Sequence, residues 1–226
     1  MDKEQHIIQS WQANAHNWIR LIESDGIESR KLVTNKAIIN AVTAANPASV
    51  FDIGCGEGWL AKELSATGVS VCGVDIIPEL ISRAKEKVNG NFFVASYEDI
   101  YSYTFKIRMS KLFDVIVINF ALLGKQSAED LLASLPAYLL PGGKLFIQTL
   151  HPYHRKEIND YVSGWKEGSW SGLGDHFTMH YEWYFRTMED WLHLLARSGF
   201  DKINTLETTQ PGSGQPLSVI FECHVK

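Results

Sequence analysis

Hydrophobic positions at the start of the chain follow a helical period. From Asp2 to about Glu23, apolar residues recur every three or four positions, which predicts an amphipathic helix. A second helix-like stretch ends near Ala45, and Thr34 is its candidate N-cap. Residues 1–46 are therefore predicted to form a helical cover ahead of the first strand.

Short apolar runs alternate with helix-like stretches in the middle of the chain. Strands are predicted at residues 50–53, 69–75, 91–95, 113–118 and 145–150. Residues 128–140 have a helical pattern and end in a tight turn at Pro141-Gly142-Gly143, whereas residues 101–112 form a polar and aromatic connection that the pattern leaves unassigned. Alternating strands and helices predict a doubly wound sheet with right-handed crossovers.

The period is lost after the fifth predicted strand. Residues 151–186 are rich in aromatic side chains and histidine, which predicts a substrate-facing insertion at the carboxyl edge of the sheet. Its tryptophans, Trp165, Trp170 and Trp183, either line an apolar pocket or form the core of this insertion. A helix follows from its N-cap Thr187 to Gly199, and residues 202–207 and 217–225 predict a terminal antiparallel hairpin.

Composition restricts the class of protein. The chain has 226 residues, 45% of them apolar and 21% charged, so residues 1–226 are expected to form one domain. No apolar run is long enough to span a membrane, and the N-terminus lacks the layout of a secretory signal. Three scattered cysteines predict a reducing, cytoplasmic location. The net charge of -5 disfavours nucleic acid as the partner. The sequence does not decide between a monomer and a homodimer.

A glycine-rich loop follows the first strand. In Asp52-Ile53-Gly54-Cys55-Gly56-Glu57-Gly58, alternate glycines let the backbone adopt positive φ and let a ligand approach the main chain. The dinucleotide fingerprint G-x-G-x-x-G places its third glycine one residue later, at the position held by Trp59. A carboxylate at Asp52 also suits a hydroxyl- or ammonium-bearing ligand better than a phosphate. The spacing therefore disfavours a dinucleotide and leaves a hydroxyl- or ammonium-bearing ligand.

Further polar residues stand at the ends of the later strands. Asp75 ends the second strand, where a carboxylate can accept hydrogen bonds from both hydroxyls of a ribose. Tyr97 and Glu98 follow the third strand, and Asn119 and Phe120 follow the fourth. Because carboxyl ends of parallel strands meet at one edge, these side chains are expected around one ligand.

The motifs in this order resemble those of class I S-adenosylmethionine-dependent methyltransferases. The resemblance covers about residues 50–225 and is nearest to the bacterial small-molecule enzymes that include ubiquinone and menaquinone methyltransferases. It implies an α/β fold, with a doubly wound, seven-stranded, mostly parallel sheet that includes an antiparallel C-terminal strand. The chain departs from those enzymes in the connection before Phe113 and in the insertion, so their quinone-precursor substrates are not expected here.

The resemblance also implies roles for individual residues. The donor S-adenosylmethionine would lie against the glycine loop and leave as S-adenosylhomocysteine. Arg30 would pair with its carboxylate or would instead be a surface residue. The implied contacts are Gly54, Cys55 and Gly56 with the methionyl part, Asp52 with its ammonium, Asp75 with the ribose, Ile76, Tyr97 and Glu98 with the adenine, and Asn119 and Phe120 with the sulfonium end.

Methyl transfer from a sulfonium mostly requires a nucleophile held in line with water excluded. If a proton must be removed, His151, just after the fifth strand, is the candidate base, with Tyr153 beside it. His151 could equally shape the turn before Pro152. His176 and His180 have a metal-like spacing, but their surroundings are not helical and no third ligand accompanies them, so no metal is expected.

The predicted function is transfer of a methyl group from S-adenosylmethionine to a small, partly apolar acceptor. One alternative is an NAD(P)-dependent short-chain oxidoreductase, which would need a Y-x-x-x-K pair after the fifth strand. Tyr153 is followed at that spacing by Glu157, and Tyr161 by Trp165. The other alternative is a non-catalytic nucleoside-binding module.

Overall fold

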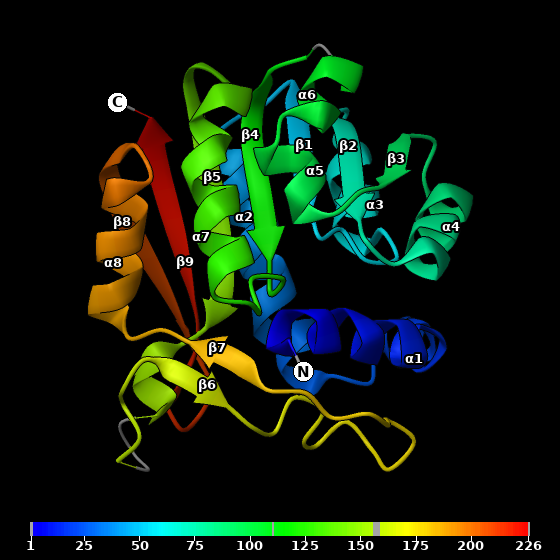
Figure 1. Ribbon diagram of the computed structural model, residues 1–226, viewed down its shortest axis with the longest axis vertical. Helices are drawn as coiled ribbons and strands as arrows, with labels where there is room; N and C mark the ends of the chain where they lie inside the picture. The colour runs from blue at the N-terminus through cyan, green and yellow to red at the C-terminus, as the bar shows by residue number, and fades with distance from the viewer. Residues whose placement is uncertain (1, 110, 156–158, 226) are drawn as a thin grey trace.

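Seven strands form the central sheet in the order β3-β2-β1-β4-β5-β9-β8 (Figure 1). The computed structural model describes residues 2–109, 111–155 and 159–225. The first five strands are parallel, and β9 runs antiparallel to both β5 and β8. This arrangement confirms the predicted fold class. The strands are β1 (Ser49–Ile53), β2 (Ser70–Asp75), β3 (Asn91–Val94), β4 (Phe113–Asn119), β5 (Leu139–Leu150), β8 (Phe200–Thr209) and β9 (Pro216–Val225).

Helices cover both faces of the sheet because its central strands are apolar on both sides. One face packs on α2 (Asn35–Ala44), α3 (Trp59–Ser65) and α4 (Pro78–Lys87) through a cluster that contains Val115, Val117 and Phe146. The other face carries a larger cluster around Phe51, Ile116 and Ile147. That cluster is covered by α5 (Tyr97–Tyr101), α6 (Thr104–Met109), α7 (Gln126–Ser134) and α8 (Met188–Arg197).

The N-terminal cover starts as predicted but continues differently. Helix α1 (Lys3–Glu23) agrees with the predicted helix, and Asp2 caps it by accepting a hydrogen bond from the backbone of Glu4. Thr34 stands at the N-cap position of α2, as predicted, but its side chain does not cap the helix. A π-helical segment, η1 (Arg30–Thr34), runs directly into α2, so Thr34 has helical dihedrals and makes no capping bond. Such wide turns often occur at functional sites.

The segment between the fourth and fifth strands also differs from its prediction. The helix ends at Ser134, a 3₁₀ turn (Leu135–Tyr138) follows, and β5 starts at Leu139 rather than at Leu145. Gly142 adopts a φ of 77°, and the pairing between β4 and β5 shifts register over this stretch. The Pro-Gly-Gly sequence thus forms a bulge inside a long strand instead of a separate turn.

Two stretches without a clear sequence period have regular elements. Most of the unassigned connection at 101–112 belongs to α5 and α6. The insertion contains a short 3₁₀ helix (Pro152–Arg155) and a two-stranded antiparallel sheet of β6 (Gly164–Lys166) and β7 (Trp183–Phe185). Short elements held mainly by tertiary contacts leave little periodic signal.

The C-terminal predictions are confirmed. Thr187 caps α8 by accepting a hydrogen bond from the Asp190 backbone, and Gly199 follows the helix with a φ of 101°. The hairpin strands β8 and β9 are both longer than predicted and lie within the main sheet.

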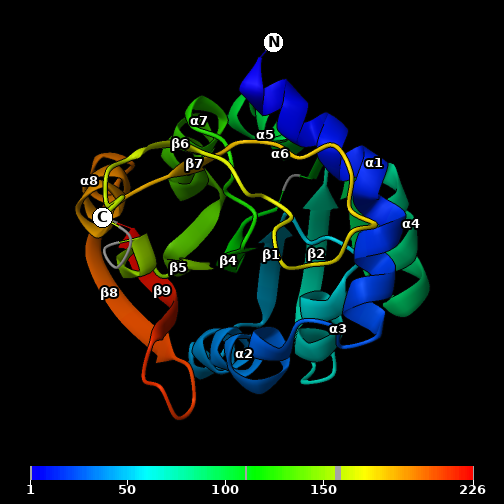
Figure 2. The same cartoon turned by 90° about the horizontal axis from the view of Figure 1, so that it is seen from below.

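Helix α1 and the insertion form a layer across the carboxyl ends of the parallel strands. Figure 1 shows the strands directed toward α1 and the β6–β7 sheet, and Figure 2 shows both segments crossing those ends. Polar residues at the strand ends therefore face this cover. Among helices built from described residues, none combines the length and apolarity needed to cross a membrane.

Candidate functional site

The glycine loop lies with its main chain close to the end of β4. Gly54 has a φ of 73°, and a Cβ built on it would lie 2.4 Å from Cβ of Ala121. The backbone N–H groups of Gly54 and Cys55 both donate to the carbonyl of Val74, which ties the loop to β2. Glycine is therefore required here for both conformation and space. Cys55 itself is buried, and burial raises the pKa of its thiol.

Asp75 binds the glycine loop to the end of β2. Its Oδ2 accepts from Gly56 N at 3.0 Å, and its Oδ1 accepts from Ile77 N at 2.9 Å. Each carboxylate oxygen keeps further acceptor capacity for a hydroxyl. Desolvation raises the pKa of Asp75 to about 6, although these backbone hydrogen bonds oppose the shift.

Asp52 lies under the loop and lacks a partner for one oxygen. The residue is 1% exposed, and its Oδ2 has no hydrogen bond. Burial raises the pKa of Asp52 to about 8, and the negative charges of Asp75 and Glu57 add to this effect. A buried carboxylate that lacks a partner is stabilised when a cationic group donates a hydrogen bond to it.

Glu57 connects the loop to the N-terminal cover. Its Oε2 accepts from Nε1 of Trp18 at 3.2 Å, whereas its buried Oε1 has no partner. The Arg30 guanidinium lies 5.5 Å from the Trp18 ring centroid and 5.0 Å from that of Trp59, and its Nε donates to Asn35. Desolvation lowers the pKa of Arg30, and the charge of Glu57 opposes this shift. Arg30 is thus held in the cover beside the loop rather than on the open surface.

The residues expected around an adenine occupy three different settings. Ile76 is half-buried against the cluster of Ala15, Ile77 and Leu80 between α1 and α4. Tyr97 extends across the edge, and its hydroxyl donates to the Ala121 carbonyl at 2.9 Å. Glu98 is exposed in the first turn of α5. The structure brings Tyr97 next to the glycine loop and leaves Glu98 at the rim.

The ends of β4 and β5 form the opposite side of the site. Asn119 and Gln148 are register partners, and the backbone N–H of Phe120 donates to the carbonyl of Gln148. Phe120 has a φ of 54°, an unusual conformation for a bulky residue and one that is found at functional sites. Asn119 Oδ1 and Gln148 Oε1 are both buried without a hydrogen-bond partner, as is Oγ1 of Thr34.

His151 lies at the turn after β5. Its Nδ1 accepts from the backbone N–H of Tyr153, and the backbone N–H of His151 donates to the carbonyl of Leu217 on β9. Its Nε2 lies 3.3 Å from Oε2 of Glu207 on β8 but has no aligned hydrogen bond. The Tyr153 ring stands 5.2 Å from the His151 ring and 5.7 Å from the Tyr161 ring, measured between centroids. These contacts support the turn-shaping role of His151, which the sequence left open beside that of a base.

Unpartnered buried polar atoms gather at this edge. Within the described ranges, such side-chain atoms occur on six residues, which belong to η1, β1, the glycine loop, the end of β4, β5 and the turn after β5. Buried polar groups are nearly always hydrogen-bonded, so this concentration marks a place where a ligand supplies the missing partners. The six residues are Thr34, Asp52, Glu57, Asn119, Gln148 and His151.

Aromatic residues of α1 and the insertion pack together above the edge. Trp11 lies 4.8 Å from Trp170 and 5.1 Å from Trp18, measured between ring centroids, and its Nε1 donates to the hydroxyl of Tyr181. Trp170 is 3% exposed, so it forms the core of the cover. The partly buried residues Trp165, Trp183 and Leu123 pack against the same cluster.

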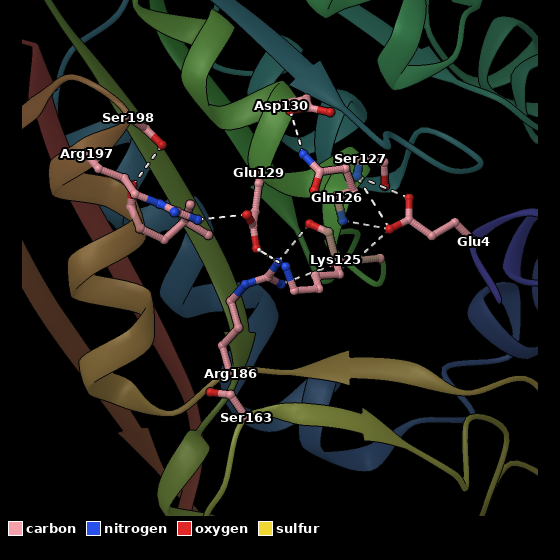
Figure 3. A network of polar contacts seen from close by, with 12 residues as sticks. Glu4, Lys125, Gln126, Ser127, Glu129, Asp130, Ser163, Arg186, Arg197 and Ser198 are labelled. Atoms are coloured by element: carbon pink, nitrogen blue, oxygen red, sulfur yellow. Dashed lines mark hydrogen bonds and ion pairs between the residues drawn. The ribbon is translucent and has the colours of Figure 1, made fainter. Parts of the chain in front are cut away.

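A polar network fixes the cover to the segment after β4 (Figure 3). Glu4 of α1 accepts hydrogen bonds from the backbone of Lys125, Gln126 and Ser127, and so caps α7 from a distant part of the chain. From the end of the insertion, the buried Arg186 donates to the carbonyls of Gly124 and Lys125. This segment, which follows Asn119 and Phe120 in the chain, is thereby held from two sides.

The two histidines with metal-like spacing face the outer surface. His176 and His180 are exposed, and their backbone carbonyls accept hydrogen bonds from Asn17 and His6 of α1. In the part of the chain that the structure describes, no three potential ligands gather around a metal position. A cavity of about 500 Å³ lies on this flank, lined by Lys3, His6, Glu167, Gly168, His180, Tyr181 and Glu182.

Sequence reasoning gave no role to Glu57, Trp18 or Gln148. Glu57 stands inside the glycine loop, so its position was a usable signal. Gln148 interrupts the apolar run Leu145-Phe146-Ile147 near the carboxyl end of β5, where a polar side chain is unusual. The pairing of Trp18 with Glu57 joins residues 39 positions apart and has no local signal.

A family model described as a methyltransferase domain matches residues 29–205. Among curated proteins, the chain is similar to a malonyl-[acyl-carrier protein] O-methyltransferase of Halalkalibacterium halodurans, with 27% identity over 76% of this chain and 70% of that protein. It is also similar to a ubiquinone biosynthesis O-methyltransferase of Rickettsia felis, with 23% identity over 73% of this chain and 70% of that protein.

Solved structures share the fold over nearly the whole chain. The plantazolicin methyltransferase BamL, crystallised with a triazolic desmethylPZN analogue and S-adenosylhomocysteine (SAH), has a TM-score of 0.68 and 18% identity, over 99% of this chain and 97% of its own. A possible histamine N-methyltransferase of Thermotoga maritima has a TM-score of 0.65 and 13% identity, over 96% of this chain and 99% of its own.

Proposed function

Because this chain belongs to the methyltransferase domain family and is an S-adenosylmethionine-dependent methyltransferase, we propose that it methylates a small, partly apolar acceptor beneath the cover formed by α1 and the insertion. The observation that carries this proposal is the gathering of unpartnered buried polar atoms at one edge of the sheet. Their positions divide into a donor side around β1 and an acceptor side around β4 and β5.

The donor side fits an amino acid joined to a nucleoside. The unpartnered Oδ2 of Asp52 would accept a hydrogen bond from the ammonium, and Arg30 would pair with the carboxylate. The main chain of Gly54, Cys55 and Gly56 would lie against the methionyl chain, because it has no side chain in the way at either glycine.

Residues at the ends of β2 and β3 would hold the nucleoside. Asp75 would accept hydrogen bonds from the ribose hydroxyls with its remaining acceptor capacity. Ile76, Tyr97 and Glu98 would surround the adenine, with Glu98 at the solvent-exposed rim.

The protein's contribution to methyl transfer would be orientation and exclusion of water. When bound, S-adenosylmethionine supplies an activated methyl group with its own leaving group. Asn119 and Phe120 come just before the segment that Glu4 and Arg186 hold. They would line the path of the methyl group, which moves in line from the sulfur to the acceptor. His151 remains a candidate base with Tyr153 beside it, although its hydrogen bonds with Tyr153 and Leu217 form the turn.

The side chains of the cover support a partly apolar acceptor. Half-buried aromatic residues such as Trp165 and Trp183, together with Leu123, offer apolar surface beside polar strand ends. The relatives named above act on malonyl-[acyl-carrier protein] and in ubiquinone biosynthesis, but the insertion of this chain argues against adopting either substrate.

We also propose that residues 1–226 work as one methyltransferase domain, as a monomer or homodimer, in the cytoplasm and without nucleic acid. The three cysteines are free and buried, which suits a reducing compartment. The net charge of -5 does not favour contact with a polyanion. Size-exclusion chromatography with light scattering measures the oligomeric state.

Membership of the methyltransferase family excludes the alternative of an NAD(P)-dependent oxidoreductase, and so it also excludes a ligand with a diphosphate. The remaining test concerns acceptor size. Purified protein is mixed with S-adenosylmethionine and either the small-molecule fraction or the macromolecular fraction of a cell extract, and SAH release is measured. We expect release with the small-molecule fraction. Release with the macromolecular fraction alone would contradict a small acceptor.

A further inference from the structure

Three residues that carry unpartnered oxygens are neighbours on the acceptor side of the site. Asn119 and Gln148 are opposite each other in the β4–β5 register. Two residues earlier on the same strands, Val117 and Phe146 both face the helices α2, α3 and α4. Since side chains alternate along a strand, Asn119 and Gln148 also point to that face, side by side at its carboxyl edge.

The Gln148 amide is only half satisfied. Its Nε2 donates to the Thr34 carbonyl at 3.2 Å and to Oγ of Ser218 at 2.9 Å, while Oε1 has no partner. Thr34 ends the π-helical segment η1, and its Oγ1 is buried and also unpartnered. The two Nε2 bonds fix the amide so that Oε1 is held in one orientation, next to the residue that supplies Oγ1.

These oxygens belong to neutral groups, unlike those on the donor side. Asn119 Oδ1 and Gln148 Oε1 are acceptors, and the Thr34 hydroxyl can both accept and donate. Leaving buried acceptors without a donor is unfavourable, so a ligand that brings protons on oxygen or nitrogen is favoured. A carbon nucleophile brings no such proton.

We propose that Thr34, Asn119 and Gln148 form the acceptor subsite, which accepts hydrogen bonds from a nucleophilic hydroxyl or amine and thereby specifies O- or N-methylation. This inference rests on the proposed function. The acceptor's lone pair forms the bond to the methyl carbon while the carbon–sulfur bond breaks and its electron pair stays on sulfur. The proton of the methylated hydroxyl or amine then passes to water, because amide oxygens and a hydroxyl are too weakly basic to keep it.

The test uses two ligands that differ at the transferred methyl. SAH carries nothing there, whereas the analogue sinefungin carries an amine in place of the methylsulfonium. Isothermal titration calorimetry gives the dissociation constant of each ligand, and their ratio isolates the contacts of that amine. We expect sinefungin to bind the wild-type protein more tightly than SAH.

Thr34→Val and Gln148→Met remove the proposed acceptors. Thr34→Val is isosteric and breaks no side-chain hydrogen bond that the structure contains, so we expect it to fold normally. Each substitution should reduce the preference for sinefungin over SAH about tenfold, which is the scale of one hydrogen bond to a charged group. The dissociation constant of SAH itself should change little.

Ser218→Ala is the matched control. It removes one partner of Gln148 Nε2 but leaves Oε1 in place. We expect this variant to lose stability and to keep the wild-type preference for sinefungin. A loss of preference in Ser218→Ala equal to that in Gln148→Met would show that Gln148 acts only through packing and would overturn the assignment.

Failure of the two proposals can be told apart. If neither ligand binds the wild-type protein, the donor side of the proposed function is wrong. If both bind but Thr34→Val and Gln148→Met keep the wild-type preference, the donor site stands and the acceptor subsite is wrong.

Discussion

Two polar regions of this protein use the same chemical groups in opposite ways. At the carboxyl edge of β1, β4 and β5, Asp52, Glu57, Asn119 and Gln148 each carry a buried oxygen that lacks a partner. In the network of Figure 3, the carboxylates of Glu4 and Glu129 and the guanidinium of Arg186 are paired. The first region lies at the edge of the sheet, whereas the second joins α7 to α1, to the end of the insertion and to α8.

This contrast indicates that the first region binds a ligand and that the second stabilises the fold. A paired, buried charge has already recovered the cost of leaving water, so it fixes structure and has little to offer a ligand. An unpaired buried oxygen retains that cost until a ligand arrives. Substitutions in the first region should therefore change ligand affinity, and those in the second should change stability.

The largest effect is expected from Asp75→Ala. Loss of the carboxylate removes the acceptor for the ribose hydroxyls and the anchor for Gly56 N. We expect SAH affinity to fall more than about 100-fold, measured by calorimetry, because two hydrogen bonds to a charged group are lost.

Asp114→Asn is the control for Asp75. Asp114 also binds a strand terminus, accepting from Ser49 N and Oγ, but at the opposite edge of the sheet. Its substitution should lower the melting temperature and leave SAH affinity unchanged. Equal loss of affinity in both variants would contradict the separation of the two regions.

In the paired region, Arg186→Leu should reduce stability without weakening the donor site. It leaves the buried carbonyls of Gly124 and Lys125 without their donor and Glu129 without a buried partner. We expect the free energy of unfolding to fall by about 3 kcal/mol in denaturant titrations, with SAH affinity within about threefold of wild type.

Arg197→Gln breaks an exposed ion pair with the same Glu129 carboxylate. Because exposed pairs contribute little, this variant should lose less than about 1 kcal/mol. If the Arg186→Leu variant instead stays folded but no longer binds SAH, this network is needed for ligand binding as well as for stability.

The third effect is a dependence of stability on pH. Asp52 binds its proton up to a pKa of about 8 in the folded protein, against 3.8 when unfolded, so the folded state holds more protons between these values. The ligand-free protein should therefore lose stability as pH rises through this window. We expect the melting temperature to fall by roughly 5 °C or more between pH 5 and pH 8.

Asp52→Asn should flatten that decline, because the amide does not titrate. In the wild-type protein, the rise in melting temperature caused by SAH should grow from pH 6 to pH 8, as an ionised Asp52 pairs with the ligand's ammonium. A decline of equal slope in Asp52→Asn would assign the effect to other groups.

Apart from the control Arg197→Gln, the smallest effect is expected from His151→Gln. If His151 shapes the turn through Tyr153 N, the glutamine variant should lose about 1 kcal/mol of stability, and its rate with a saturating acceptor should change less than threefold. A general base would instead cost 10²-fold or more in rate with little change in stability. Turnover and denaturant titration of the same preparation decide between these roles.

Sequence patterns were enough for the fold and the class of enzyme. Each of these signals depends on neighbours within a few residues: the alternation of apolar runs, the glycine loop and the carboxylate of Asp75. The predicted sheet with its antiparallel C-terminal strand is confirmed. The predicted methyltransferase family and its methyl donor are confirmed as well. The β5 bulge was missed because Pro141-Gly142-Gly143 is also typical of a turn.

The rest of the site depends on contacts between distant segments. Nothing near Thr34 in the sequence indicates that a π-helical turn places it against Gln148, 114 residues away. Likewise, Glu4 caps a helix whose own N-cap position is Lys125, which makes no side-chain cap. Such pairings follow from the folded topology and have no local pattern.

We expect the unpartnered carboxylate of Asp52, under the glycine loop, to receive the amino-acid end of the methyl donor. A crystal structure of the wild-type protein with SAH tests it most directly. We expect the ligand's ammonium at about 3 Å from Oδ2 of Asp52, with the ribose on Asp75. A ligand bound elsewhere, or in this site with its ammonium away from Asp52 and an ordered water on Oδ2, would contradict it.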